Sequence, residues 1–409
     1  MVTSATNTNT DIQIAEQNTK LYYWVSALSN MWFMEAVWIY HFRIYASDTQ
    51  IGWIDGLAFT FALLVEIPSG ALADRFGRKK IYIIGLASAA ISMAGLGLAT
   101  SNIELFIWNF LLLGSMSLVS GADEALVYDS VLNANLEDKW DSIKAKQHRI
   151  VLLVVTFSTI VGGLLFLINT RLPFIAFSII IIGAIFLALK YTETDANTLK
   201  ANSKASSYLE TLLSGIRHLL LTKNRHLALL TFGVLGLWYT FDWGALRPLQ
   251  LDSFGYNETR QPYAAALILI ISAIAVGFVR HTRLIFNTQY GIYIVSAIAF
   301  LFFLATAYDF ELWTLIPLCL SIATLSILSV WLNDLVQRST DSNKRSTVLS
   351  AFSFLYKLPL VLVSPLSGIY SDGQNISQLV VYISVILLVF ILISYILFIR
   401  NSEKNYEHH

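Results

Sequence analysis

Cysteine and charge are both scarce in this 409-residue chain. The single cysteine, Cys319, lies within an apolar run and has no partner for an internal disulfide, so redox chemistry and a thiolate metal site are not expected. Charged residues make up only 13% of the chain, too few to cover the surface of a soluble protein of this size. The formal net charge is zero, which argues against a nucleic-acid partner.

Motifs that would indicate an enzyme are also absent from the sequence. It contains no H-E-x-x-H, no G-x-S-x-G and no nucleotide-binding motif, so neither hydrolytic chemistry nor ATP-driven work is indicated. The first twenty residues are polar and lack an apolar core, so no cleavable signal peptide is expected. We therefore expect no catalytic residues, no cofactor and no bound metal.

Apolar residues, in contrast, dominate the chain. They make up 56% of it and recur in runs of about twenty residues, the length with which a helix crosses a bilayer. These runs are continuous rather than alternating, as in Ile175–Ile185 and Leu379–Leu392, which favours helices over a β-barrel. The pattern predicts an all-α polytopic membrane protein with twelve transmembrane helices, at residues 21–45, 51–73, 80–100, 104–133, 147–169, 172–190, 226–250, 261–280, 285–306, 311–337, 345–370 and 377–399.

The basic residues predict the orientation of these helices. Of the 27 Lys and Arg residues, 22 fall in segments on one side of the predicted membrane and four on the other. Because cytoplasmic loops carry the excess of basic residues, both termini are predicted to be cytoplasmic. The longest polar stretch is a linker that carries leucines at the spacing of an amphipathic helix, although a disordered linker is the alternative. The predicted organisation is a tail at 1–20, six-helix bundles at 21–190 and 225–399, the linker at 191–224 and a tail at 400–409.

A dense motif follows the second predicted helix, where the chain reads Gly70-Ala-Leu-Ala-Asp74-Arg75-Phe-Gly77-Arg78-Lys-Lys. Gly77 permits the positive φ that a short connection needs, and Asp74 and Arg78 lie one helical turn apart, close enough to pair. The stretch resembles the G-x-L-A-D-R-x-G-R-K signature of the major facilitator superfamily. The resemblance implies two pseudo-symmetric six-helix bundles. It also implies a conformational latch formed by Gly70, Asp74, Arg75, Gly77, Arg78 and an acid on helix 4, for which Asp129 stands at the matching position.

Two further signatures of that family are altered here. Its proton-coupled members often carry an arginine on helix 4 shortly before a glycine, whereas Phe110 stands at that place before Gly114. Its antiporters usually show G-P-x-x-G-G on helix 5, of which this chain keeps only Gly162-Gly163. The resemblance to the bacterial drug and small-molecule exporters therefore implies the fold and leaves the mode of coupling open.

Ionisable residues inside the predicted helices are costly, so each one calls for a function or an ion-pair partner. Glu35, Asp242 and Lys357 lie nearest the membrane midplane, and Asp123 and Glu124 lie part-way toward the cytoplasm. Neighbouring residues on a helix point about 100° apart, so at most one of Asp123 and Glu124 faces a cavity.

Aromatic residues surround two of these acids. On helical spacing Trp32 and Trp38 share a face with Glu35, and Trp238 and Tyr239 lie one turn before Asp242. An acid framed by aromatic rings suits a lipophilic cation, and a desolvated carboxylate suits reversible protonation. The alternative is that the acids form ion pairs that only hold helices together.

These features predict a secondary transporter that works by alternating access. The leading hypothesis is proton-coupled export of a small amphiphilic, cationic molecule, as in a multidrug antiporter, with protons carried by Glu35, Asp242 or the Asp123-Glu124 pair. One alternative is an anion or metabolite carrier, a symporter or uniporter, centred on Lys357, and another is an intramembrane lipid-modifying enzyme. The expected partners are a small-molecule substrate, protons and the lipid bilayer, for a monomer in the inner (plasma) membrane.

Overall fold

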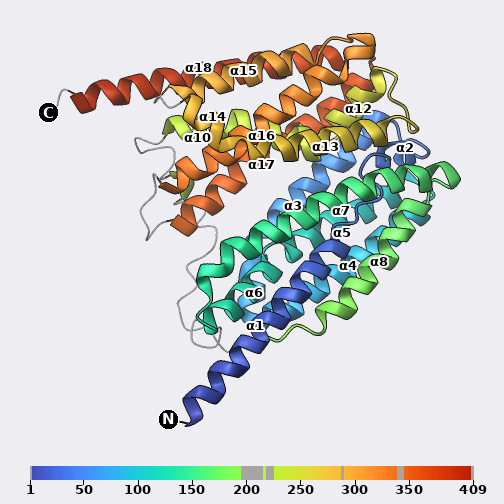
Figure 1. Ribbon diagram of the computed structural model, residues 1–409. Helices are drawn as coiled ribbons and strands as arrows, with labels where there is room; N and C mark the ends of the chain where they lie inside the picture. Colours follow the sequence, from blue (N-terminus) through green and yellow to red (C-terminus); the bar gives the residue numbers. More distant parts are fainter. Residues whose placement is uncertain (1, 195–214, 218–224, 287–289, 339–344, 407–409) are drawn as a thin grey trace. The chain divides into compact units, whose positions relative to one another are not determined.

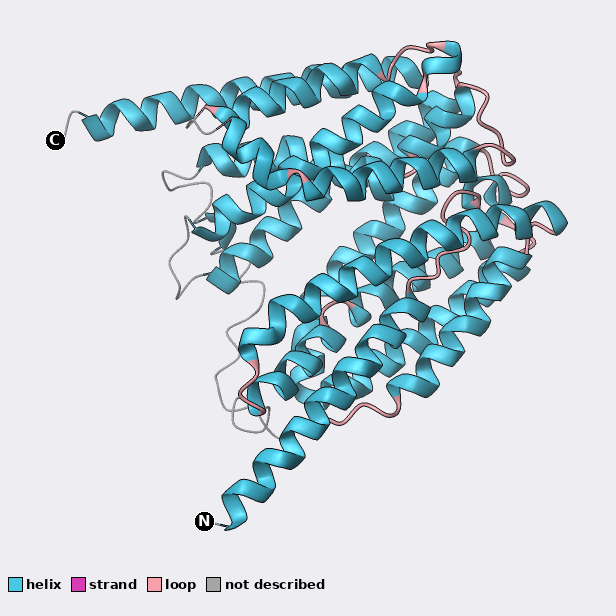
Figure 2. Ribbon diagram, in the orientation of Figure 1, coloured by secondary structure: helices cyan, strands magenta, loops and turns pink. Residues whose placement is uncertain are grey.

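The computed structural model describes residues 2–194, 215–217, 225–286, 290–338 and 345–406. Within these residues every regular element is a helix, as Figure 2 shows, and the all-α prediction is confirmed. The chain forms two compact units: Met1–Tyr45 with Leu57–Ala205, and Ala46–Gly56 with Ser206–His409. The predicted amphipathic helix of the linker lies almost wholly outside the described residues.

The first unit is a bundle of long helices (Figure 1). In it α4 packs on both α5 and α8, and α1 packs on α6, α7 and α8. A 3₁₀ turn at Glu137–Lys139 precedes α7. Its helices are α1 (Val2–Ser29), α2 (Trp38–Phe42), the greater part of α3 (Asp48–Phe76), α4 (Arg78–Leu98), α5 (Asn102–Val119), α6 (Ala122–Asn133), α7 (Trp140–Ile168) and α8 (Leu172–Ala188).

The first predicted span is broken, contrary to the expectation of one helix over 21–45. Helix α1 ends at Ser29, residues 30–37 form a chain of turns, and α2 starts at Trp38. The side-chain Nδ2 of Asn30 donates to the carbonyl of Ser26 at 2.8 Å and so satisfies an acceptor at the end of α1. No glycine or proline marks this break in the sequence, and the broken segment packs closely against a neighbouring helix.

That neighbour is α7, which meets the broken segment at Gly162. A Cβ atom at Gly162 would lie 1.6 Å from the carbonyl oxygen of Phe33, so only glycine lets α7 approach the turns this closely. Gly162 belongs to the retained half of the helix 5 signature. The position therefore has a packing role in this chain.

We expect Gly162→Ala to destabilise the protein by about 1–3 kcal/mol, the usual cost of overpacking a well-packed site. The matched control is Gly183→Ala on α8, where the added Cβ would meet only Leu28 Cδ1 at an ordinary 3.8 Å. Thermal unfolding of the two purified variants provides the measurement. Equal melting temperatures for both variants would contradict the close approach at Gly162.

The fourth predicted span is also interrupted. Helix α5 ends at Val119, Ser120 leaves helical geometry with ψ of 117°, and Gly121 adopts a φ of +77° before α6 begins. Glycine adopts this left-handed conformation without strain, so Gly121 is the sequence signal for this break. The expectation of one continuous helix over 104–133 is wrong at this point.

The middle of α1 binds the segment that follows α8. The side chain of Asn18, which is fully buried, donates to the carbonyl of Thr192 at 2.9 Å and accepts from its N–H at 3.0 Å. The first twenty residues, predicted as a tail, are therefore helical from Val2 onward, and their last turn is part of the bundle.

The second unit contains the remaining helices, several of them irregular. A π-helical turn at Thr231–Leu235 joins α10 to α11, Gly244 separates α11 from α12, and α13 and α14 meet at a bend of 54°. A 3₁₀ turn at Glu311–Trp313 precedes α16. The helices are α10 (Arg225–Leu230), α11 (Gly236–Trp243), α12 (Leu246–Ser253), α13 (Gln261–Gly277), α14 (Val279–Ile285), α15 (Gly291–Ala305), α16 (Leu315–Arg338), α17 (Arg345–Asp372) and α18 (Ile376–Tyr406).

The first residues of α3 pack on α17 within this second unit. The carboxylate of Asp372 accepts hydrogen bonds from the N–H groups of Asp48 and Thr49, at 3.2 and 2.9 Å, and thereby caps the N-terminus of α3. One turn earlier on α17, a Cβ at Gly368 would lie 2.0 Å from the carbonyl oxygen of Asp48. Deeper in the contact, the Ser364 hydroxyl donates to Asp55 at 2.6 Å.

Length and apolar composition single out six of the described helical segments as able to cross a membrane, or seven if the bent pair α13–α14 counts as one span. Many large apolar side chains on these helices are exposed, such as Leu153 at 73% and Leu362 at 66%. In water such surfaces would be unfavourable, whereas in lipid they are solvated by acyl chains. The chain is a multi-pass membrane protein.

Candidate functional site

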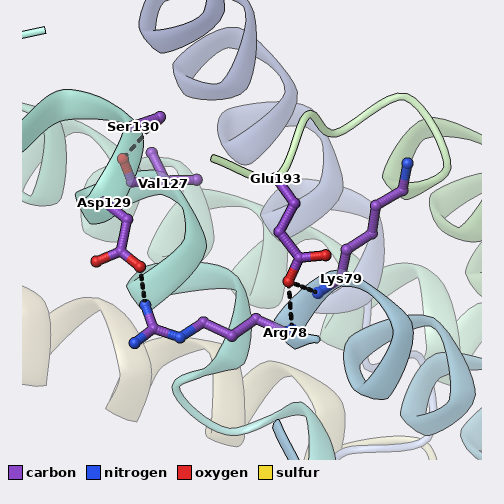
Figure 3. Close-up of polar contacts among 6 residues, drawn as sticks. All are labelled: Arg78, Lys79, Val127, Asp129, Ser130 and Glu193. Carbon is purple, nitrogen blue, oxygen red and sulfur yellow. Dashed lines mark hydrogen bonds and ion pairs between the residues drawn. The ribbon is translucent and has the colours of Figure 1, made fainter. Parts of the chain in front are cut away.

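An ion pair joins the start of α4 to α6 at the motif that follows the second predicted helix. Arg78 is the first residue of α4, and its Nη1 donates to Asp129 Oδ2 at 2.5 Å (Figure 3). The two side chains are 17% and 16% exposed, so water screens the pair less than it screens a surface salt bridge. The structure thus brings together Arg78 and Asp129, the two positions that the resemblance implied. That this pair acts as a conformational latch stays a prediction.

Glu193 also contacts the start of α4, beside the Arg78–Asp129 ion pair, and its involvement was not predicted from the sequence. Its carboxylate accepts from the backbone N–H groups of Arg78 and Lys79, at 2.5 and 3.4 Å (Figure 3). The unpaired N–H groups and the partial positive charge of a helix N-terminus favour an acid there. The only signal in the sequence is an acid that follows α8 by a few residues.

The turn between α3 and α4 is built on Gly77. Its φ is +94°, and a Cβ there would come within 3.0 Å of the Glu193 carboxylate. Arg75 is exposed, with its guanidinium 5.3 Å from the centre of the Phe76 ring. Gly70 lies in α3, and the side chain of Asp74 lies outside the described part, so its pairing with Arg78 stays a prediction.

Asp123 and Glu124 have different surroundings in the first turn of α6. Glu124 forms an ion pair with Lys144 on α7 and is 43% exposed. The Asp123 side chain accepts from the N–H of Glu124 at 2.7 Å and lies beside the hydroxyl of Tyr82, a buried residue of α4. Of the two acids, Asp123 is therefore the one that faces the interior of the bundle.

Glu35 lies in the turns between α1 and α2 and is half-buried. Because residues 30–37 are not helical, Trp32 and Trp38 do not share a helical face with it, and that expectation is wrong. Trp32 packs against Phe177 of α8 with ring centres 5.4 Å apart, whereas Trp38 packs edge-on against Phe42 at 5.2 Å. The two tryptophans thus have separate partners in the bundle.

Asp242 is paired across a helix break in the second unit. It stands near the end of α11, and its Oδ1 lies 3.3 Å from Nη1 of Arg247, which follows the break at Gly244. The side chain of Arg247 is 5% exposed and that of Asp242 is 27% exposed. The pairing of the two was missed because a straight helix would hold residues five apart on different faces.

Aromatic rings from α11 and α17 meet beside this ion pair. Tyr239 lies one turn before Asp242, and its ring centre is 5.5 Å from that of Tyr356 and 6.1 Å from that of Trp243. Lys357 follows Tyr356 on α17 and is half-buried, as is Trp238 on α11. The structure therefore brings Tyr239, one turn before Asp242, into contact with Tyr356, a contact that the sequence did not predict.

Three comparisons with known proteins complete the description of these sites. The family model described as "Major Facilitator Superfamily" matches residues 21–136 and 150–364. No curated protein matches the chain significantly. Solved structures with the same fold are the nucleoside transporter NupG (TM-score 0.73, 13% identity, 94% of this chain and 99% of that one), an inward-facing bacterial homologue of the human lysosomal transporter Spinster (0.72, 14%, 96% and 98%) and a D-xylose–proton symporter (0.67, 12%, 91% and 97%).

Proposed function

This chain belongs to the major facilitator superfamily, whose members carry small molecules across membranes, and we propose that it exports a small amphiphilic cation in exchange for protons. The coarse function, transport of a small molecule rather than enzymatic catalysis, follows from the family. The cation, the protons and the direction are the proposal. A proton symporter among the solved structures of this fold supports the idea that the fold accommodates proton coupling.

The observation that carries the proposal is the acid with its aromatic neighbours in the second unit. Asp242 pairs with Arg247 at 3.3 Å, and Tyr239, one turn before Asp242 on α11, contacts the rings of Trp243 and Tyr356. An aromatic face attracts a cation, and the attraction grows when the cation is desolvated. These groups suit a substrate with an ammonium group and an apolar body.

The same acid offers a simple mechanism of exchange. One carboxylate can be neutralised by a proton or by a cationic substrate, but not by both at once, so the two ligands compete for it. Either of them would weaken the attraction between Asp242 and Arg247 and so release the break at Gly244 between α11 and α12. Binding of one ligand on each side of the membrane then gives alternating access with obligatory exchange.

A second candidate, an anion carrier, is favoured by two cationic residues: Lys357, which follows Tyr356 on α17, and Arg247, the partner of Asp242. Transport assays with a panel of cationic and anionic substrates distinguish the cation exporter from the anion carrier. For the cation exporter we expect reconstituted wild-type protein to move lipophilic cations and Lys357→Ala to retain at least half of that rate. Uptake of organic anions that Lys357→Ala abolishes, without any movement of cations, would establish the anion carrier instead.

Other parts of the proposal concern the setting of the protein. The excess of basic residues on one side predicts both termini in the cytoplasm, and short connections between helices suit the inner membrane of a bacterium. We propose that the protein works as a monomer, since each unit already buries its own core.

A further inference from the structure

A pocket of about 200 Å³ is lined by residues of the first unit, and none of the acid and ring residues described in the second unit belongs to its lining. Helices α1, α4, α5 and α8, which Figure 1 shows together, provide its walls. Most of its lining is apolar, and the polar groups lie at one pair of helix ends. Lining residues that matter for the argument are Ser29, Asn30, Trp32, Ala89, Met116 and Phe177.

Two helices end at this pocket. Helix α1 ends at Ser29, and α5 ends at Val119, followed by Ser120; all three residues line the pocket. The last carbonyl groups of a helix lack intrahelical partners, and its C-terminus carries a partial negative charge. Two C-terminal ends at one pocket therefore favour a ligand that donates hydrogen bonds and carries positive charge.

Two buried hydroxyl groups with unmet hydrogen bonds stand on α1 and α4, two of the helices that line the pocket. The hydroxyls of Ser26 and Tyr82 are 2% and 1% exposed as residues and have no hydrogen-bond partner in the described part of the chain. Tyr82 lies beside Ser29, which lines the pocket, and beside Asp123. Buried polar groups without partners are costly, so a ligand or water that satisfies them is favoured.

The apolar part of the lining suits an aromatic ring. The Trp32 and Phe177 rings lie 5.4 Å apart, centre to centre, and Met116 adds a polarisable thioether. An engineered apolar cavity of roughly 150 Å³ accommodates benzene, so 200 Å³ has room for one ring with a short polar substituent. Larger ring systems would not fit without movement of the helices.

We propose that this pocket is a ligand site within the first unit for a single-ring aromatic ammonium compound. The ring packs against Trp32, Phe177 and Met116, and the ammonium group donates hydrogen bonds at the ends of α1 and α5, near Ser29 and the Tyr82–Asp123 group. The site concerns binding alone and does not depend on proton coupling or on the acid of the second unit.

The test is calorimetric titration of the purified full-length protein in detergent at neutral pH, with three probes of nearly equal size. We expect benzylammonium to bind saturably, benzyl alcohol to bind at least fivefold more weakly and benzoate not to bind. Ala89→Leu, which fills the pocket, is expected to weaken benzylammonium binding at least tenfold. The matched control is Ala87→Leu on the same helix, outside the pocket lining, which is expected to leave affinity within twofold.

Further variants test the same pocket if the first one fails to fold. If Ala89→Leu does not fold, Met116→Trp fills the same pocket from α5, and Tyr82→Phe, which removes one hydroxyl, is expected to weaken binding several-fold. Absence of saturable binding to wild type, or equal binding of benzoate, overturns the proposal. So does binding that survives both filling variants but is lost in Asp242→Asn, because the ligand then sits in the second unit and only the transport proposal stands.

Discussion

Replacing Asp242 with asparagine is expected to reduce proton-driven movement of a lipophilic cation at least about tenfold, which corresponds to a loss of about 1.4 kcal/mol or more. The amide has nearly the shape of the carboxylate but neither binds a proton nor neutralises a cation. It also leaves the buried Arg247 without its 3.3 Å partner. The measurement is the initial rate of uptake of a fluorescent cation into liposomes with an imposed pH gradient.

The control for this variant is Asp252→Asn, the same chemical change on α12 of the same unit. It is expected to transport at close to the wild-type rate. If Asp242→Asn also transports normally, Asp242 and Arg247 only join α11 to α12, and the proton carrier has to be sought at Glu35 or Asp123.

Breaking the ion pair between Arg78 and Asp129 is expected to have the second large effect. Either Arg78→Asp or Asp129→Arg places two like charges where one pair now lies at 2.5 Å, and the repulsion drives α4 and α6 apart. We expect each single variant to lose at least about tenfold in transport rate, again about 1.4 kcal/mol. The double variant Arg78→Asp with Asp129→Arg is expected to recover a substantial part of the rate.

Recovery in the double variant would show that the two residues act through their interaction with each other, because two independent defects would not compensate. Lys80→Ala serves as the control, because Lys80 is an exposed basic residue of the same helix and is expected to tolerate the change. Normal transport by both single variants would show that the pair has no part in the transport cycle. A double variant as inactive as the singles would show that Arg78 and Asp129 act separately, for example through Glu193.

Much of the fold was predictable from hydropathy and one motif. The apolar runs fixed the helical class, and the run from Gly70 to Lys80 indicated the family to which the chain belongs. These features can be predicted because they depend on local sequence. A membrane span needs consecutive apolar residues, and the turn between α3 and α4 needs Gly77 at a φ of +94°.

The details of the candidate sites were less predictable because they arise from packing. The break at residues 30–37 has no glycine or proline of its own and is in close contact with Gly162 of α7, far away in sequence. It separates Trp32 from Trp38, which helical spacing had placed together. In the same way Glu193 reaches the start of α4 from the segment after α8, in which the neighbouring Thr192 is bonded to Asn18 of α1.

Contacts in the second unit were also not predictable from sequence spacing. Asp242 and Arg247 are five residues apart, and only the break at Gly244 lets their side chains meet. Likewise, the stretch from Pro365 to Asp372 resembles the stretch from Pro68 to Asp74 yet caps the N-terminus of α3 through Asp372. Sequence similarity gave no indication of that contact.

The most direct test of the central claim, exchange of a cation for protons, is to follow the internal pH of proteoliposomes when a lipophilic cation is added outside. The account predicts that cation entry drives protons out, so the internal pH rises in proportion to the cation taken up, and that Asp242→Asn shows no such rise. Cation uptake with unchanged or falling internal pH would contradict the exchange mechanism.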